Sequence, residues 1–411
     1  MRILHLADVH IGVENYGRVD PETGLSTRLQ DFLQTYDEAV DYAIDNAVDL
    51  FLFSGDAYKS RDPSQTHQRE FAKRVARLAS NGIAVFLLVG NHDTPHVIGK
   101  ATALEIFKTL DVPNVTIGDT LRTYRVETRS GPLQVLAVPW VRRSTFLAGD
   151  EARGMNPDQV NEAIQERLAR AIRSEAESLD PDVPAILSGH LSVGEATLAS
   201  EQSMMIGRDY ILMKSDLALP QLEYIALGHI HRHQILNTDP HVVYSGSLQR
   251  IDFGEEKDQK GFCIVDLDPG HSRGARMTGF SFQPVAAREF VTVSVDVRPS
   301  ELDPTAAVIR AISSRDLSEA VLRLEISLPA ELEPHLRDAE ISQALDGVHF
   351  VASISRNIAE QRRTRLESDY SKGLDPREVL KVYLAQREVP VDRANVLMNY
   401  AERLMADDSE Q

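Results

Sequence analysis

Histidine, aspartate and asparagine side chains recur in this sequence directly after short runs of apolar residues. Residues 83–89 are apolar throughout, and Gly90-Asn91-His92-Asp93 follows at once. Alone, this tetrapeptide could be an ordinary turn, since Gly, Asn and Asp are common turn residues. Five apolar runs end in this way, and they carry Asp8, His10, Asp56, Asn91, His92, His190, His229 and His231. Carboxylate, imidazole and carboxamide groups bind divalent metals, so the repetition indicates one shared metal centre.

The number of candidate ligands is sufficient for two metal ions. Asp56 ends its own apolar run between the others, and its two oxygens could bridge both ions. Two neighbouring ions can hold a phosphate group, activate a water molecule and neutralise the charge that develops on the phosphorus oxygens. Such a centre would hydrolyse phosphoesters without a serine or cysteine nucleophile.

The apolar runs predict the elements that position these side chains. Runs of strand length without polar alternation are typical of strands buried on both faces, and Asp8 and His10 would share one face of such a strand. Helical spacing between the runs completes an α/β layer, a fold that places its chemistry at strand ends. Strands are expected at 3–7, 50–53, 83–89, near 115, and at 123–126, 133–140, 184–190, 224–231, 242–245 and 262–267, and helices at 29–46, 65–80, 101–110 and 157–178.

The chain of 411 residues is too long for one ordinary core. We expect the metal centre within residues 1–284 and a small α+β domain at 285–358, with a helix at 333–345. A basic, polar linker is predicted at 359–373. Two amphipathic helices follow at 374–411, and because they cannot bury their apolar stripes alone, they either pack on the body or bind a partner.

The acidic balance of the chain limits how it could bind nucleic acid. Acidic residues number 62 and basic residues 44, for a net charge of −18. This excludes a chain-wide basic surface, so a local patch or a partner would have to contact phosphates. Arg69, Lys73 and Arg77 share one face of the predicted helix at 65–80, where they form either a solvated face or a phosphate-facing stripe.

Cysteine content and hydropathy indicate the compartment. Cys263 is the only cysteine and lies in an apolar run, so an inert buried thiol is expected and no disulfide can form within the chain. No long apolar segment with a basic flank is present. The sequence therefore predicts a cytoplasmic protein without a membrane partner.

The order of the motifs resembles that of the calcineurin-like metallophosphoesterases over about the first 270 residues. These motifs are Asp8-x-His10, Gly55-Asp56, Gly90-Asn91-His92-Asp93, Gly189-His190 and Gly228-His229-x-His231. Their local sequences look like those of the nuclease subunit of DNA double-strand-break repair complexes, the bacterial SbcD type and the archaeal and eukaryotic meiotic recombination 11 type. The resemblance implies a four-layer α-β-β-α sandwich, a small α+β capping domain and a C-terminal helix-loop-helix.

The resemblance also implies roles for the site residues. One manganese ion would be held by Asp8, His10, Asp56 and His231, and a second by Asp56, Asn91, His190 and His229. The same ligands would tolerate magnesium or iron. His92 would be the general acid for the leaving oxygen, with Asp93 orienting its ring.

By the same resemblance, the activity would be manganese-dependent 3′-to-5′ exonuclease cleavage of duplex ends and endonuclease cleavage of single strands or hairpins. An SbcC-type ABC ATPase would bind residues 374–411 and supply any ATP dependence, since the chain lacks a phosphate-binding loop motif. A nucleoid-associated homodimer is expected. Leu104, Phe107 and Leu110 are candidates either for its interface or for the core.

One residue departs from the family pattern. Many members have a histidine three residues after the bridging aspartate, where this chain has Lys59. Lysine can meet a phosphate as a point charge but lacks the geometry and titration of imidazole, so the balance of exonuclease and endonuclease activity stays open. The alternatives are another calcineurin-like phosphoesterase acting on small or protein phosphoesters, and a DNA-end-tethering scaffold with weak hydrolysis.

The other histidines are expected to lie outside the metal centre. They lack a partner at ligand spacing or lie away from the predicted strand ends, and His233 is the nearest to an exception because it extends the motif of His229 and His231. The set comprises His5, His67, His96, His233, His241, His271, His335 and His349.

Overall fold

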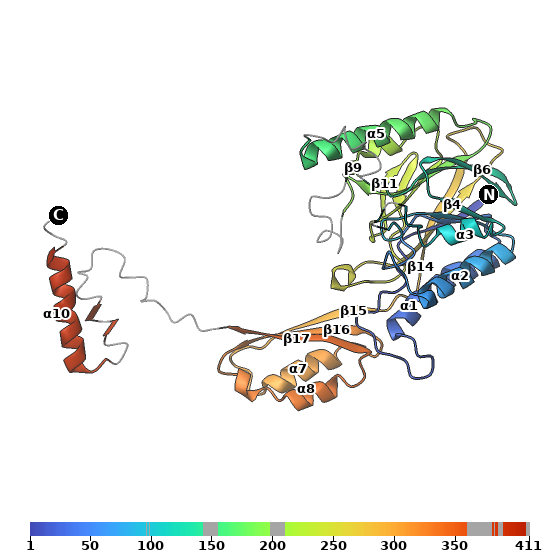
Figure 1. Cartoon of the computed structure of the whole chain (residues 1–411). Helices are drawn as coiled ribbons and strands as arrows, with labels where there is room; N and C mark the ends of the chain where they lie inside the picture. The colour runs from blue at the N-terminus through green and yellow to red at the C-terminus, as the bar shows by residue number, and fades with distance from the viewer. Residues whose placement is uncertain are drawn as a thin grey trace.

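The computed structural model of the chain describes residues 1–95, 97, 99–142, 155–197, 210–359, 380–381, 383–384 and 389–407. Two six-stranded sheets and a three-stranded sheet form its framework (Figure 1). The predicted linker and the first of the two C-terminal helices lie outside the described residues, apart from a few positions. The second C-terminal helix is α10 (Val391–Asp407). No helix of the described residues is long and apolar enough to span a membrane.

The first sheet has the order β14-β13-β1-β2-β3-β4. Its strands β1 to β4 run parallel, and the β13-β14 hairpin adds antiparallel to β1. Every residue of β2 and β3 is buried, as the apolar runs predict. The strands are β1 (Arg2–Leu6), β2 (Leu50–Phe53), β3 (Ala84–Leu88), β4 (Val115–Gly118), β13 (Gly261–Leu267) and β14 (Met277–Pro284).

The second sheet has the order β11-β12-β10-β7-β6-β5. Its strands are β5 (Arg122–Thr128), β6 (Gly131–Val138), β7 (Ala185–His190), β10 (Tyr224–Gly228), β11 (Gln234–Thr238) and β12 (His241–Tyr244). A separate two-stranded sheet is formed by β8 (Ser192–Val193) and β9 (Ile211–Leu212), which lie between β7 and β10 in the sequence. The edge strands β11 and β14 were not predicted, because an edge strand needs no continuous apolar run.

Helices cover the outer face of each sheet. The first sheet packs on α1 (Thr27–Asp45), α2 (Gln65–Ser80) and the short α3 (Glu105–Thr109) through one apolar cluster. The second packs on α5 (Pro157–Glu177) and α6 (Lys214–Leu217). A third cluster joins the inner faces of the two sheets. The predicted four-layer α-β-β-α sandwich is therefore confirmed, although α3 covers only part of the helix expected at 101–110.

Local sequence explains where the long helices begin. The Asn156 side chain accepts a hydrogen bond from the N–H of Gln159, and the Gln159 side chain accepts one from the N–H of Asn156. Pro157 follows at the first helical position, where its missing N–H costs nothing. Ser64 caps α2 by accepting a hydrogen bond from His67 N–H.

The third sheet belongs to a unit at residues 290–359, called here the cap unit. It consists of β15 (Phe290–Asp296), α7 (Pro304–Ser313), β16 (Val321–Pro329), α8 (Asp338–Ala344) and β17 (Phe350–Ala359), and it has its own apolar core. All three strands are parallel, and each crossover contains a helix. The expected α+β unit is therefore corrected to α/β. The helix expected at 333–345 is also divided, into a 3-10 turn η3 (Glu333–His335) and α8.

Candidate metal centre

The ends of five strands meet in one place and carry all the predicted site residues. Strands β1, β2 and β3 are parallel in the first sheet, as are β7 and β10 in the second, so each group ends at one sheet edge. The hydroxyls of Ser54 and Ser188 lie 3.0 Å apart and join the two sheets there. The residues brought together are Asp8, His10, Asp56, Asn91, His92, Asp93, His190, His229 and His231.

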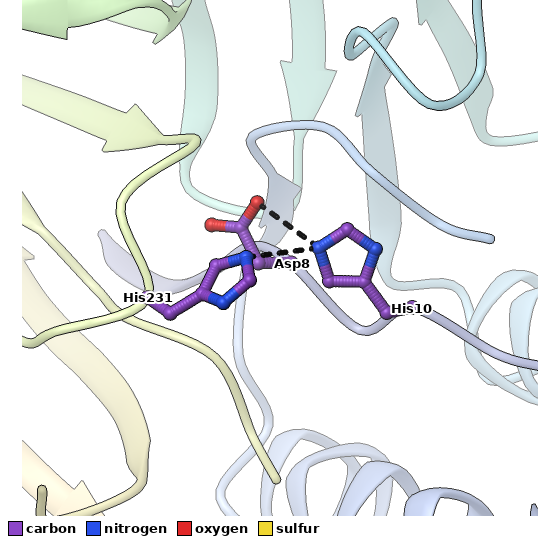
Figure 2. A group of neighbouring side chains, drawn as sticks. All are labelled: Asp8, His10 and His231. Atoms are coloured by element: carbon purple, nitrogen blue, oxygen red, sulfur yellow. Dashed lines mark hydrogen bonds and ion pairs between the residues drawn. The ribbon is translucent and has the colours of Figure 1, made fainter. Parts of the chain in front are cut away.

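Asp8, His10 and His231 form one group of potential ligands, and all three are buried (Figure 2). The Nε2 atoms of His10 and His231 lie 3.0 Å apart, and the Asp8 carboxylate lies 3.9 Å from His10 Nε2. Two imidazole nitrogens and a carboxylate that point at one another in a buried space are a suitable donor set for a divalent cation.

Asn91, His190 and His229 converge on a second point. The Asn91 side-chain oxygen lies 2.8 Å from His190 Nε2 and 3.1 Å from His229 Nδ1. Asp56 lies between the two groups: one carboxylate oxygen is 3.7 Å from His10 Nε2, and the other is 3.4 Å from His190 Nε2. This is the position that a bridging carboxylate would need.

The outer ring nitrogens of two histidines are held by acceptors. His231 Nδ1 lies 2.8 Å from Glu255 Oε1, and His190 Nδ1 lies 2.8 Å from the Ser54 carbonyl oxygen. An N–H that donates to such an acceptor leaves the Nε2 lone pair directed at the centre, which is how metal-binding histidines are usually oriented. Glu255 could not be recognised from the sequence, because Gly254-Glu255-Glu256-Lys257 has the composition of a solvated loop.

The backbone at the centre adopts uncommon conformations. Strand β1 ends at Leu6, so Asp8 and His10 do not lie on one strand face as predicted. Both residues have positive φ, 54° and 48°, as do Asp56 at 62° and His229 at 97°. Such values are uncommon outside glycine and concentrate at functional sites. Hydrogen bonds from Asp8 N–H and His10 N–H to the backbone after β2 hold this turn.

Two glycines allow other groups of the candidate centre to approach the backbone closely. A Cβ atom at Gly90 would lie 2.2 Å from Asp56 Oδ1 and 2.4 Å from Asp56 N. A Cβ atom at Gly228 would lie 2.2 Å from the Ser54 carbonyl oxygen. The glycines before Asn91 and His229 are therefore required by close approach between strand ends.

Burial and neighbouring charges shift the protonation of the site. Burial raises the pKa of Asp8 to about 7 and lowers that of His10 well below its usual value. Burial opposes the charge on His190, but the Asp56 carboxylate outweighs it and raises the pKa of His190 to about 9. Burial likewise opposes ionisation of Asp56, yet His190 and His92 hold its pKa well below the usual value. Buried carboxylates need such a counter-charge, and a bound cation would supply one.

His92 and Asp93 lie beside the ligands but contact different groups from those expected. The His92 Nδ1 atom lies 2.8 Å from the Lys59 carbonyl oxygen, and the His92 ring lies 5.0 Å from the His10 ring. The Asp93 carboxylate instead accepts hydrogen bonds from Gly90, Asp56 and Ala57 N–H at 2.9, 2.9 and 3.0 Å. The prediction that Asp93 orients the His92 ring was wrong, because its carboxylate is used by three main-chain donors.

One aromatic side chain of the site was not predicted as part of it. The Trp140 ring lies 5.2 Å from the His229 ring and 5.4 Å from the Tyr210 ring. The sequence carried a signal for it, since Trp140 follows the apolar run of β6 as the ligands follow theirs. The Trp140 ring therefore lies beside the buried His229 ring.

Residues outside the centre follow the simpler expectations. Arg69 and Lys73 pair with Glu70, and Arg77 pairs with Asp37 and Asp41, so this row is an ion-paired helix face.

The His233 ring stacks on Phe282 at 4.1 Å and its Nδ1 lies 3.0 Å from the Tyr244 carbonyl oxygen. Cys263 is a buried free thiol. His96 lies outside the described residues.

Comparison with known proteins identifies relatives in sequence and in structure. A protein of Escherichia coli K12, named as the SbcD subunit of the nuclease SbcCD, is 25% identical over 93% of this chain and 92% of its own length. A protein with the same name from Rhodobacter capsulatus is 26% identical over 66% of this chain and 67% of its own. The solved structure of TT1561 from Thermus thermophilus is 15% identical and covers 69% of this chain and 98% of that one, with a TM-score of 0.35.

The candidate ligands at the strand ends, and their order along the chain, all lie within the part of the chain that a known family describes. The sequence profile of the calcineurin-like phosphoesterases matches residues 1–233, which is more than half of the chain. The protein therefore belongs to the calcineurin-like phosphoesterase family.

Proposed function

We propose that this protein is the nuclease subunit of a DNA double-strand-break repair complex and that it hydrolyses DNA phosphodiesters with two manganese ions. The observation that carries the proposal is the convergence of two ligand groups on the shared carboxylate of Asp56. The choice of DNA as substrate is supported by the relatives named as SbcD subunits of the nuclease SbcCD, since one of them aligns with 93% of this chain, well beyond the phosphoesterase profile.

The donor set fits two divalent cations. One would be held by Asp8, His10, Asp56 and His231, and the other by Asp56, Asn91, His190 and His229. Bound there, the ions would neutralise phosphate charge and provide a water of lowered pKa as nucleophile. Mixed nitrogen and oxygen ligands suit manganese, and magnesium or iron would also be accepted.

His92 is suited to protonate the leaving oxygen. Its Nδ1–H donates to the Lys59 carbonyl, which leaves Nε2 to carry the transferable proton. Its own main-chain N–H donates to Asp56 Oδ1 at 2.8 Å, so the acid is held at a fixed position relative to the bridging carboxylate. Asp93 would act as a positioning residue that fixes the ends of β2 and β3. A general acid of this kind contributes roughly 100- to 10,000-fold to the rate.

Two surfaces would serve the assembly. Helix α10 exposes Val396, Leu397 and Tyr400, an apolar face that would bind the coiled coil of an SbcC-type ATPase. Of the residues predicted near α3, Leu104 and Phe107 are buried in the core, while Leu110 is exposed. A homodimer through this region would therefore use Leu110 and not the other two.

The test compares wild-type protein with His92→Asn, with His271→Asn as the control, because His271 lies in an exposed turn. Each protein is given manganese and end-labelled duplex DNA, bis(4-nitrophenyl) phosphate or 4-nitrophenyl phosphate. The proposal expects wild type and His271→Asn to degrade DNA, and His92→Asn to bind manganese normally but cleave at least about 100-fold more slowly.

Two results would contradict the proposal. Cleavage of the small substrates alone would indicate a different calcineurin-like phosphoesterase. DNA binding without hydrolysis of any substrate would indicate a tethering scaffold. The exonuclease-to-endonuclease ratio, measured on duplex ends and hairpins with Lys59→His beside wild type, would show what the lysine side chain changes.

A further inference from the structure

A buried ion pair lies directly behind the metal centre. The Glu255 and Lys260 side chains are fully buried, and Lys260 Nζ lies 2.7 Å from Glu255 Oε2. The other Glu255 oxygen, Oε1, accepts the hydrogen bond from His231 Nδ1 at 2.8 Å. Both carboxylate oxygens are therefore used, one by the ammonium and one by a predicted metal ligand.

Further contacts prevent this carboxylate from turning away. Glu255 Oε2 also accepts a hydrogen bond from Ile251 N–H at 3.2 Å. Lys260 Nζ donates to the His231 carbonyl oxygen at 3.1 Å and to Ser247 Oγ at 2.9 Å. The lysine thus contacts both the carboxylate and the main chain of the ligand that the carboxylate orients. The network holds His231 at its ring and at its backbone.

The same turn is attached to the cap unit. Glu255 ends the 3-10 turn η2 (Phe253–Glu255), and the next residue, Glu256, accepts hydrogen bonds from Thr292 N–H at 2.9 Å and Thr292 Oγ1–H at 2.7 Å. The Phe253 ring lies 5.0 Å from the Phe290 ring on β15. The Arg323 guanidinium of β16 lies 4.0 Å from the centroid of the Phe253 ring. Residues 253 and 256 therefore contact the cap unit on either side of the residue that contacts His231.

We propose that Glu255 is a positioning residue for His231, and that the turn containing Glu255 couples the position of the cap unit to the metal centre. The inference rests on the proposed function only in requiring that Asp8, His10 and His231 bind a divalent ion. A displacement of β15 would pull on Glu256, shift Glu255 and change the orientation of the His231 ring. The affinity for metal would then depend on where the cap unit sits.

The first test uses two matched double variants, E255Q/K260M and E255L/K260M. Both remove the buried charges together, which avoids an unpaired ammonium. Only the glutamine variant keeps an acceptor for His231 Nδ1–H. Manganese affinity is measured by titration calorimetry, with thermal unfolding as the check of folding. We expect E255L/K260M to bind manganese roughly 10- to 100-fold more weakly than E255Q/K260M.

Equal manganese affinity of the two double variants would overturn the positioning role. If either variant fails to fold, Glu255→Asp provides the same test, since it keeps the charge opposite Lys260 and withdraws the carboxylate by one methylene group. Weaker manganese binding by Glu255→Asp supports the role, and unchanged binding overturns it. Failure of wild type to bind manganese would instead contradict the proposed function itself.

The second test concerns the cap unit and uses Glu256→Ala, which removes the acceptor for Thr292 without touching the centre. Glu325→Ala is the control, because its carboxylate accepts a similar hydrogen bond from Ser294 Oγ–H within the cap unit. Glu256→Ala should weaken manganese binding by roughly 2- to 30-fold, and Glu325→Ala should not. In the E255L/K260M background the effect of Glu256→Ala should disappear. If Glu256→Ala bound manganese with wild-type affinity, this result would overturn the proposal that the turn couples the cap unit to the metal centre.

Discussion

The imidazoles of His10 and His231 face each other with their Nε2 atoms 3.0 Å apart, although 221 residues separate them in the chain. Glu255 holds the outer nitrogen of His231, so the proton of that ring is directed away from His10. The two inner nitrogens and the Asp8 carboxylate can then satisfy one cation together.

Manganese should stabilise the folded protein because these groups converge only in the native state. At a free manganese concentration 100 times the dissociation constant, the free energy of unfolding should rise by about 2.7 kcal/mol for each site. Thermal unfolding with and without manganese measures this rise, and a chelator should reverse it. An unfolding temperature that manganese leaves unchanged would argue against the metal centre.

Replacing Gly90 by alanine should damage both stability and metal binding. The added Cβ would lie 2.2 Å from Asp56 Oδ1, so the bridging carboxylate would have to move. We expect a loss of about 1–3 kcal/mol in urea unfolding, together with weaker manganese binding. Gly347→Ala is the matched control, since no atom lies within 4 Å of the added Cβ. Similar effects of the two substitutions would refute the close-approach argument.

Asp93→Asn should destabilise the protein without altering the His92 contact. The carboxylate serves three main-chain donors, and an amide would present its NH2 group to at least one of them. One unsatisfied buried donor costs about 1–3 kcal/mol. Asp316→Asn, at an exposed turn where the carboxylate accepts from Ser318, should change the stability by less than about 0.5 kcal/mol. Equal stability of Asp93→Asn and wild type would contradict this role.

His5 should make stability depend on pH. Burial, aided by His233, lowers the pKa of His5 to about 3, whereas an unfolded histidine has a value near 6.5. As the pH falls, His5 therefore binds a proton in the unfolded chain before it does so in the folded chain. The contribution of neutral His5 to the free energy of unfolding is complete above about pH 6.5 and is lost as the pH falls toward 3. The expected slope is about 1.4 kcal/mol per pH unit.

His5→Asn should remove this part of the slope while keeping a partner for the Tyr224 hydroxyl, which lies 2.9 Å from His5 Nδ1. Urea unfolding of both proteins between pH 4 and 7 measures the difference. Parallel stability curves for the variant and the wild type would show that His5 does not titrate in this way.

Sequence alone determined the strands of the two sheets that end at the centre, and the residue types that follow them. Apolar runs at 50–53 and 83–89 became fully buried strands, because a strand covered on both faces needs no polar residue. The alternation of such runs with helical patterns indicated an α/β layer. The four-layer arrangement was implied by the resemblance to the calcineurin-like metallophosphoesterases. The glycines before Asn91 and His229 were visible as motif residues, although the atoms that require them were not.

Only the tertiary structure decided which groups hold those residues in place. Asp8 and His10 share the site through left-handed backbone turns and not through strand alternation, and nothing in their local sequence indicates this. Asp93 binds main-chain donors of two strand ends, and Glu255 reaches a histidine 24 positions earlier. Composition and periodicity report on neighbours along the chain, whereas these hydrogen bonds form between segments that meet only after the two sheets have packed.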